Sequence, residues 1–419
     1  MLASALLIGA LAVLFARAAD FAQRNFAAFV AREPYAPLLL TPVLFVGIAA
    51  LTRSFAPASR GSGIPQVIAA SRAPDGETTA GLLSIRTAAA KLLLSLAALF
   101  GGASVGREGP TVQLAAAAMT QVHKLLRVPV TSGVLIAGGA AGVAGAFNTP
   151  LAGIAFAIEE LAVAYEQRIA LLVMAAVMIS GLTSQGIAGN YVYFGHVSAT
   201  LSLPVVLIAA PIVGVGGGIC GGLFSRAFLA LRGPVGRWRA ALGRRALTTA
   251  LVCGFAVAAI GVFGRGLTWG TGYVPTKAML EGAQGPFWFG PAKFIAVLAT
   301  SVSGMPGGIF SPSLAVGAGV GNLLAPLFPH AQSGAIVMLG MAAYFVGVVR
   351  APLTAVIIVS ETTGTTSSIL PLFATCLIAD WAGALVCRER LYHALARDFM
   401  PPGAELTPAA EAEGGGEKG

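Results

Sequence analysis

The chain has 419 residues, of which 56% are hydrophobic and only 10% are charged, and its formal net charge is +9. A soluble domain carries about 25% charged residues, so this composition excludes an ordinary soluble globular protein. The stretch 294–349 contains no Asp, Glu, Lys or Arg. It is far longer than the roughly 20 residues that one spanning helix needs. We therefore expect an all-α polytopic membrane protein.

The positive charge would suit a nucleic-acid partner in a soluble protein, but its distribution favours a different interpretation. Loops that stay in the cytoplasm carry an excess of Lys and Arg, and this bias sets the orientation of membrane helices. Two clusters follow the pattern: Arg232, Arg237, Arg239, Arg244 and Arg245, and later Arg388, Arg390 and Arg397. We expect lipid around the protein, a cytoplasmic C-terminus and no nucleic-acid partner.

Apolar segments follow one another along the chain, and we expect them to be helices. They cover approximately 1–29, 36–57, 80–100, 110–126, 130–147, 150–160, 170–190, 203–231, 246–263, 289–303, 309–329, 334–349, 352–360 and 369–387. Two of them, 150–160 and 352–360, are too short to span a bilayer. The first has no basic n-region and no clear cleavage site, which favours a membrane helix over a signal peptide.

Clusters of glycine and proline interrupt these segments. They are Ser62–Pro65, Gly109-Pro110, Asn148–Pro150, Met305–Gly308 and Ala351-Pro352. Unpaired backbone groups cannot face lipid, so such breaks must be buried in protein or line a polar cavity. Short and interrupted helices at corresponding places in two halves are typical of transporters built from inverted repeats.

A weak internal echo supports two related halves. The sequence from Asn148 to Leu151, followed by Glu160, resembles the sequence from Arg350 to Leu353, followed by Glu361. The spacing from proline to glutamate is 10 residues in the first half and 9 in the second.

The stretch Gly106-Arg107-Glu108-Gly109-Pro110 places two charges between the uncharged apolar runs Leu92–Val105 and Thr111–Thr120. A carboxylate at membrane depth is costly and indicates a functional site. Glycine permits unusual backbone angles and proline suits the first turn of a helix. We expect a broken-helix junction, with Glu108 at the mouth of a helix that begins near Gly109. An ordinary loop with an exposed charge pair is the alternative.

Three glycine-proline breaks share one design, in which each opens a helix. They are Gly61–Pro65, Gly106–Pro110 and Gly307–Pro312. The first turn of a helix has free backbone N–H groups and a partial positive charge, so it attracts anions. Several helix starts directed at one spot would bind a small anion weakly enough to release it again. Ser62 adds a hydroxyl donor at the first break, whereas three unrelated tight turns are the alternative.

Other chemical motifs are less convincing. Gly102–Gly106 fits the G-x-S-x-G pattern around Ser104, but no strand precedes it. Gly216–Gly221 fits G-x-G-x-x-G inside an apolar segment, where close helix packing is the better interpretation. The four cysteines and four histidines have no metal-ligand or triad spacing. We therefore expect neither an enzyme nor a metal or cofactor site.

The three breaks, together with Tyr392 in Arg390-Leu391-Tyr392, resemble motifs of the CLC family of chloride channels and chloride/proton antiporters. The stretches Gly145–Gly153 with Glu159-Glu160, and Arg350–Thr354, match that family as well. The resemblance covers residues 1–400 and implies a CLC-type fold of many tilted, broken and re-entrant helices in two inverted-topology repeats. Approximate halves are 1–195 and 196–400. A short polar tail, 401–419, has the composition of a disordered segment.

The resemblance also implies the residues of an anion site. Ser62 and Tyr392 would be hydroxyl ligands of a central chloride, and Ile309 and Phe310 would contribute backbone N–H groups. Gly109 completes this anion-binding set. The family resemblance further implies a homodimer with one anion pathway in each subunit, embedded in the inner membrane of a bacterium.

Two carboxylates would carry the protons. Glu108 matches the external gating glutamate and Glu160 the internal proton glutamate, with Glu159 as the alternative because it is adjacent in sequence. An ionised Glu108 would compete with chloride for the helix starts, and a protonated one would swing aside. Arg107 and Lys91 are expected to support the site, as structural partners or through their positive potential.

The chain departs from the family pattern in three places. Gln66 stands where an acidic residue often follows the first break, so Lys91 lacks an obvious local carboxylate partner and would snorkel, pair elsewhere or add potential to the pathway. The cytoplasmic helix that precedes the first membrane helix in the family is not expected. The C-terminal nucleotide-sensing domains of many relatives are not expected either.

The sequence therefore predicts a chloride/proton antiporter in which chloride is the bound substrate and no cofactor takes part. Ser62, rather than proline, at the first break favours chloride over nitrate by family resemblance. A passive voltage- or pH-gated chloride channel of the same fold is the first rival. An intramembrane hydrolase using Ser104 is a remote second, because no paired base is evident.

Overall fold

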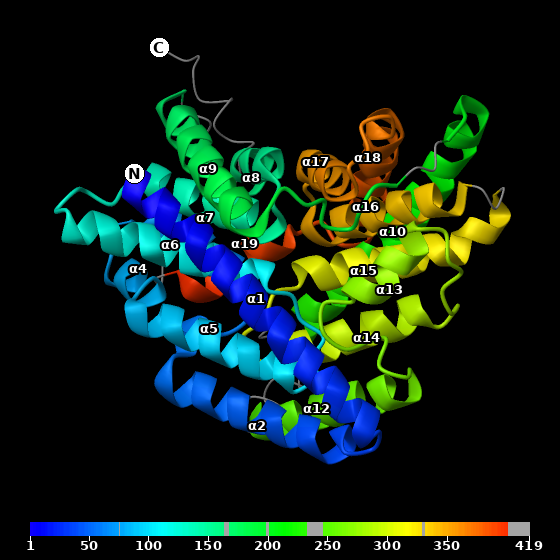
Figure 1. Ribbon diagram of the computed structural model, residues 1–419, viewed down its shortest axis with the longest axis horizontal. Coiled ribbons are helices and arrows are strands. Elements are labelled where there is room, and N and C mark those ends of the chain that lie inside the picture. Colours follow the sequence, from blue (N-terminus) through cyan, green and yellow to red (C-terminus); the bar gives the residue numbers. More distant parts are fainter. Residues whose placement is uncertain (75, 163–166, 198–200, 233–245, 329–331, 401–419) are drawn as a thin grey trace, which may run out of the picture.

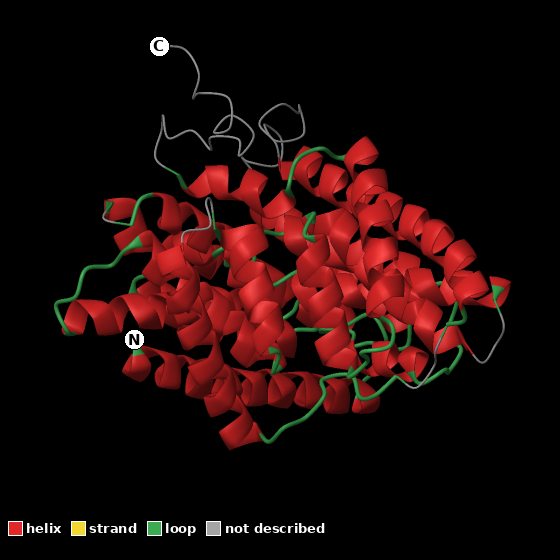
Figure 2. Ribbon diagram, turned by 90° about the horizontal axis from the view of Figure 1, so that it is seen from above, coloured by secondary structure: helices red, strands yellow, loops and turns green. Residues whose placement is uncertain are grey.

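In the computed structural model the protein is helical throughout the described residues, which are 1–74, 76–162, 167–197, 201–232, 246–328 and 332–400. Figure 2 shows helices and loops in these ranges and no strand. Extended pairing there is confined to two isolated bridges, which join Gly61 to Pro306 and Gly106 to Gly308. Most of the mid-chain arginine cluster (237–245) and the tail (401–419) lie outside the described residues.

The expected helices are present with small shifts at their ends. The α-helices are α1 (Leu2–Arg32), α2 (Pro37–Phe55), α3 (Ile64–Arg72), α4 (Glu77–Leu82), α5 (Ile85–Phe100), α6 (Glu108–Leu125), α7 (Ser132–Phe147), α8 (Pro150–Phe156), α9 (Gln167–Ala188), α10 (Leu203–Arg232), α12 (Ala246–Phe263), α13 (Tyr273–Leu280), α14 (Phe289–Val302), α15 (Phe310–Leu324), α16 (Ser333–Val349), α17 (Pro352–Thr363), α18 (Ile369–Val386) and α19 (Leu391–Ala396). A π-helical turn, Ala157–Leu161, continues α8. The short helices α13 and α19 are absent from the apolar segments of the sequence.

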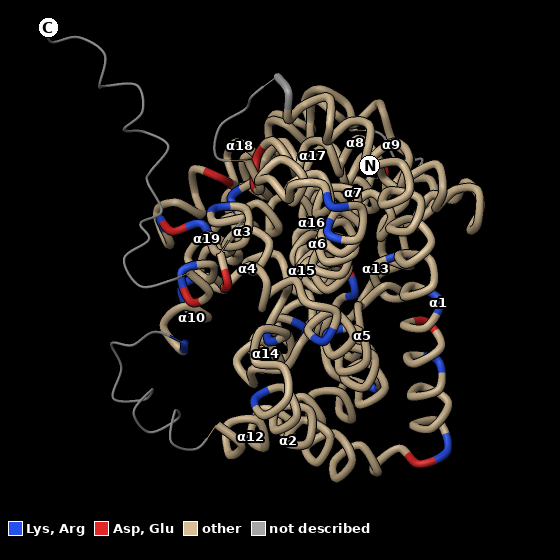
Figure 3. The backbone as a smooth tube through the Cα atoms, turned by 90° about the vertical axis from the view of Figure 1, so that its left-hand side faces the viewer, with Lys and Arg blue, Asp and Glu red and all other residues tan. Residues whose placement is uncertain are grey.

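Eight helices within the described residues are long and apolar enough to cross a membrane. In Figure 1, α1 crosses the molecule diagonally, while α2 and α12 lie side by side at the bottom. Figure 3 shows charged residues grouped near α19 and the end of α10, and again along α1. The apolar spans lie between loops and helix ends that carry the charge, as expected for a membrane protein.

Within the described residues, the run of helices from α5 to α9 recurs as the run from α14 to α18. In both halves a fully apolar helix, α7 or α16, ends at a residue in the left-handed conformation, Asn148 (φ 60°) or Arg350 (φ 66°). A short helix then begins at a proline, Pro150 in α8 or Pro352 in α17. A proline suits a first helical turn because its missing N–H would have no partner there. Both short segments predicted from the sequence are thus helices that follow a sharp break.

Each half also contains one fully buried lysine whose ammonium group donates hydrogen bonds to backbone carbonyl oxygens of the described residues. Lys91 lies in α5 and Lys293 in the corresponding helix α14. Each Nζ donates to a pair of carbonyl oxygens two residues apart, at 2.7–2.9 Å: Ser59 and Gly61 for the first, Thr268 and Gly270 for the second. The repetition extends from helix order to individual side-chain contacts.

The glycine-rich stretch of α10 serves helix packing. A Cβ at Gly221 would collide with the carbonyl oxygen of Tyr344 and lie 2.7 Å from Cα of Gly347, both in α16. On the neighbouring face, a Cβ at Gly222 would lie 2.9 Å from the carbonyl oxygen of Gly383 in α18. Small residues let helix backbones approach closely inside membranes. The interpretation of this motif as a packing device rather than a nucleotide site is confirmed.

Candidate functional site

The three glycine-proline breaks meet in the middle of the structure through backbone hydrogen bonds. The N–H of Gly61 donates to Met305 O at 3.0 Å, and the N–H of Gly307 donates to Gly61 O at 3.0 Å. Gly106 and Gly308 exchange two hydrogen bonds, of 2.7 and 2.9 Å. The breaks are therefore parts of one site, and the alternative of three unrelated turns is wrong.

This arrangement brings the starts of α3, α6 and α15 together. A Cβ at Gly109 would collide with the hydroxyl of Ser62 and lie 3.2 Å from Cα of Gly308, so only glycine permits this approach. Gly63, just before α3, has a φ of 112°, which L side chains rarely adopt. Each helix start has free N–H groups and a partial positive charge. Their convergence produces a region of positive potential without a cationic side chain.

Two buried hydroxyls lie at this region. Ser62 follows the first break, and Tyr392 comes from α19, which packs against α3 and places the phenol beside Ser62. Ser62 is 6% exposed and Tyr392 is fully buried. Neither hydroxyl has a hydrogen-bond partner within the described part of the chain. An unpaired buried hydroxyl costs about 1–3 kcal/mol, so two at one place indicate a binding site for an acceptor.

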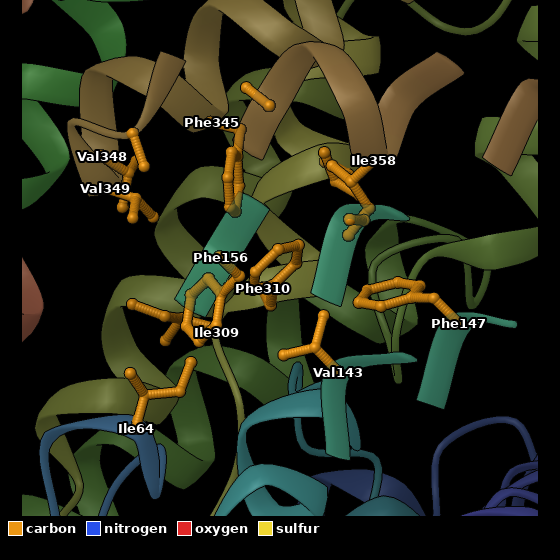
Figure 4. Close-up of a cluster of buried hydrophobic side chains, with 14 of the residues drawn as sticks. Ile64, Val143, Phe147, Phe156, Ile309, Phe310, Phe345, Val348, Val349 and Ile358 are labelled. Carbon is orange, nitrogen blue, oxygen red and sulfur yellow. The ribbon is translucent and has the colours of Figure 1, made fainter. Parts of the chain in front are cut away.

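The start of α15 is fixed by the side chain of Phe310. Its ring packs against Phe345 of α16 at 4.3 Å, Phe147 of α7 at 5.2 Å and Phe156 of α8 at 6.3 Å between centroids. Figure 4 shows this aromatic group with Ile309 next to it. The aromatic packing anchors the first residue of α15, so the backbone N–H groups of residues 309 and 310 are held at the convergence point.

Glu108 is the first residue of α6 and is 1% exposed. Its carboxylate lies against Gly106 and beside Ser311 in the first turn of α15. Among the described residues neither carboxylate oxygen has a hydrogen-bond partner. The exposed-loop alternative for this stretch is therefore wrong, because Glu108 is a buried carboxylate between two helix starts.

Arg107 forms its hydrogen bonds with α1. Its Nη1 donates to Ala16 O and to Asp20 Oδ1 of α1, both at 2.8 Å, and its guanidinium lies over the ring of Tyr193. Asp20 is half-exposed, so the ion pair itself stabilises the fold only weakly. The side chain fastens the start of α6 to α1, which agrees with the structural role considered for it.

Lys91 does not snorkel. Its Nζ donates to the carbonyl oxygens of Ser59 and Gly61, which directly precede Ser62. Gln66 holds the same loop through Nε2, which donates to Arg60 O at 2.6 Å and to Ala58 O at 3.1 Å. The first break is thus fastened by two side chains that bind backbone carbonyl groups, and Lys91 requires no carboxylate partner.

Glu160 lies in the π-helical turn and is fully buried. Neither of its carboxylate oxygens has a hydrogen-bond partner among the described residues, although Oε1 lies 3.6 Å from Nε2 of His393. His393 directly follows Tyr392 in α19. No sequence pattern indicates this contact, because His393 lies far along the chain from Glu160 and has no motif spacing to it.

Glu159 has a different environment from its neighbour. Its carboxylate accepts hydrogen bonds from the backbone N–H groups of Leu353 (3.1 Å) and Thr354 (2.7 Å) and from the Thr354 hydroxyl. It therefore caps the start of α17, as carboxylates commonly do at helix N-termini. The wider π-helical turn directs two successive carboxylates to different places.

Glu361 of α17 caps α8 in return, accepting from the N–H groups of Leu151 (3.1 Å) and Ala152 (2.7 Å). The two halves therefore exchange caps. This corrects the internal echo, because the counterpart of Glu361 is Glu159 and not Glu160. Each capping glutamate follows the first proline of its own short helix by the same number of residues, so Glu160 has no counterpart in the second half.

A cavity of about 20 Å³ lies beside the three helix starts and near α19. The buried residues Ser62 and Ile309 line it together with the partly exposed Arg60 and Arg232. Both arginines contact Oδ2 of Asp398, at 3.5 and 3.6 Å. The volume of this cavity is close to that needed by one molecule or ion of the size of water. A narrow, positively charged cavity of this kind suits a small anion.

The comparisons with known proteins agree with this geometry. A family model described as voltage gated chloride channel matches residues 43–384. The H(+)/Cl(-) exchange transporter ClcA of Yersinia pseudotuberculosis serotype IB (strain PB1/+) is 31% identical over 418 residues, which cover 92% of this chain and 84% of that protein. ClcA of Yersinia pestis bv. Antiqua (strain Angola) has the same identity and coverage.

The chain belongs to the voltage gated chloride channel (CLC) family. It is an integral, multi-pass membrane protein. Solved structures share the CLC fold. A slow cyanobacterial Cl-/H+ antiporter has a TM-score of 0.82 at 23% identity, covering 95% of this chain and 96% of that one. A CLC-type fluoride/proton antiporter has a TM-score of 0.77 at 22% identity, covering 94% and 96%.

The two adjacent glutamates of this CLC protein should respond differently to mutation. Glu159→Ala and Glu361→Ala each remove a helix cap and should lower the free energy of unfolding by about 1–2 kcal/mol. Glu160→Gln removes no hydrogen bond and should leave stability unchanged or slightly raised. Unfolding of the purified variants in detergent measures this. Equal destabilisation by Glu159→Ala and Glu160→Gln would contradict the assigned environments.

Proposed function

We propose that this protein exchanges chloride for protons across a membrane. The observation that carries the proposal is the pairing of one anion site with two buried, unpartnered carboxylates, Glu108 and Glu160. A passive anion path needs no second buried carboxylate, and charged groups at membrane depth are retained for function. The names of the Yersinia relatives, which are H(+)/Cl(-) exchange transporters, support the same activity.

Chloride binds in this proposal where α3, α15 and α19 meet. The hydroxyls of Ser62 and Tyr392 donate to it, together with the backbone N–H groups of Ile309 and Phe310, while Gly109 leaves room beside them. No ammonium or guanidinium group is a ligand, since Arg107 and Lys91 are engaged with other groups. Binding by partial charges holds a dehydrated anion and still allows it to leave.

Glu108 acts as the gate. Its ionised carboxylate and chloride are attracted to the same helix starts, so the carboxylate closes the path when it occupies that position. Protonation removes its charge and its attraction to the N–H groups, and the side chain then swings aside. Burial between two helix starts supports this role, because the carboxylate needs to move only a short way to reach the anion site.

Glu160 supplies the second proton site. It lies next to α19, which also carries Tyr392. The binding of Glu159 to α17 supports the assignment to Glu160, because a carboxylate that holds a helix start is not free to carry protons. Protons then pass between Glu160 and Glu108 as chloride moves in the opposite direction.

The remaining features of the proposal concern assembly and orientation. Two inverted halves, 1–195 and 196–400, form one transport domain, and the exchanged caps of α8 and α17 support this division. The family resemblance supports a homodimer with one pathway per subunit. The bacterial relatives and the arginines near the C-terminus support a bacterial inner membrane with the C-terminal end in the cytoplasm.

The rival functions receive less support. A voltage- or pH-gated chloride channel would share the fold and the anion site, but it leaves Glu160 without a role. A hydrolase centred on Ser104 is disfavoured, because the Ser104 hydroxyl donates to Thr268 O at 3.1 Å. That hydroxyl joins two loops, and its hydrogen-bond partner is a backbone carbonyl oxygen and not a base.

Purified protein in liposomes tests the exchange directly. An imposed chloride gradient should drive protons against their own gradient, because the two ions share one obligatory cycle. Chloride flux and external pH are recorded together after the gradient is established. Chloride flux without uphill proton movement would favour the channel and contradict the exchange.

The two glutamates should fail in different ways in the same liposomes. Glu108→Gln imitates the protonated gate, so chloride flux should continue with neither proton coupling nor pH dependence. Glu160→Gln should lower proton flux about tenfold or more, as loss of a proton-transfer group does, while chloride binding is retained. Coupling that persists in Glu108→Gln refutes the gate, and normal coupling in Glu160→Gln moves the proton role elsewhere.

A further inference from the structure

Glu160 has no exposed surface, so a proton from water must reach it through another group. Its neighbour Glu159 is bound to the start of α17 and is not positioned to deliver protons. The imidazole of His393 lies beside Glu160, with Nε2 at 3.6 Å from Oε1, and 20% of the His393 side chain is exposed. Within the described residues, His393 is thus a titratable group that touches both the buried carboxylate and the surface.

We propose that His393 carries protons between the aqueous side of α19 and Glu160. This role rests on the proposed exchange and adds an entry step to it. A proton from water binds Nδ1 while Nε2 releases its proton to Oε1 of Glu160. The ring remains neutral overall. It resets by turning toward the water, where Nδ1 releases its proton and Nε2 takes one up, before it turns back to Glu160. Both nitrogens of one ring are suited to this transfer, because one donates while the other accepts.

The separation of 3.6 Å is longer than a hydrogen bond, but a small rotation of either side chain closes it. Catalytic hydrogen bonds are often loose before the substrate binds. In α19 the two neighbouring residues point about 100° apart, since an α-helix has 3.6 residues per turn. Tyr392 therefore faces the anion site while His393 faces Glu160, and one short helix contacts both transport paths.

The charged groups around the imidazole favour its neutral form. Burial and, after it, the positive neighbours Arg390, Arg72 and Arg397 together lower the pKa of His393 to about 4. These arginines come from α3 and from the two ends of α19, and Glu160 faces the ring from the π-helical turn. A neutral ring does not form a lasting ion pair with Glu160, so it does not trap the proton that it delivers.

His393→Ala in the full-length protein tests the relay in liposomes. Proton flux should fall about tenfold or more, in the range of a lost general acid, while chloride flux continues, so the ratio of chloride to protons rises. Imidazole added to the buffer should restore much of the proton flux by occupying the space of the missing ring. His393→Gln fills that space and should resist rescue.

Two controls separate this role from other effects. His196→Ala changes an exposed histidine away from Glu160 and should alter neither proton flux nor its response to imidazole. A double variant carries both His393→Ala and Glu160→Gln. Any proton flux that imidazole produces in it is carried by imidazole through the lipid and not by the protein. Normal proton flux in His393→Ala overturns the relay, and so does a parallel loss of both fluxes that imidazole does not restore. Wild-type protein without coupled flux overturns the exchange itself, whatever the result for His393.

Discussion

The site depends on the backbone hydrogen bonds that join three interrupted helices. Gly61 pairs with Met305 and Gly307, and Gly106 pairs with Gly308, so three helix starts from distant parts of the chain meet at one point. Each start contributes N–H groups and a partial positive charge. A single helix start would bind an anion weakly and from one side. In the proposed site, three of them would replace much of the hydration shell of the anion while leaving no full charge to hold it permanently.

The fold also separates structural carboxylates from functional ones. Glu159 and Glu361 each cap a short helix of the opposite half, which ties the two halves together near the anion site. Glu108 and Glu160 receive no hydrogen bond among the described residues and are buried. Leaving a buried carboxylate unpaired costs stability, whereas a capping carboxylate adds it. Under the proposed exchange, stability is lower at the two positions where a proton binds and leaves.

The helices were predictable from the sequence because the suitability of a segment for lipid depends on the apolar side chains of that segment alone. The breaks at Ser62, Glu108 and Ile309 were also predictable, since glycine and proline act on their own backbone. Contacts between distant residues were not. The sequence echo matched Glu361 with Glu160, although an equal spacing of 9 residues from the proline in each half points to Glu159. The contact of His393 with Glu160 depends on the position of α19, which no local pattern sets.

The most direct test of the anion site is a crystal structure of the protein in bromide, whose anomalous scattering locates the ion. The account predicts a peak within hydrogen-bond distance of the Ser62 and Tyr392 hydroxyls and of the first N–H groups of α15, inside the cavity that Arg60 and Arg232 also line. Bromide bound only at the surface, or beside a cationic side chain away from the three helix starts, would contradict it.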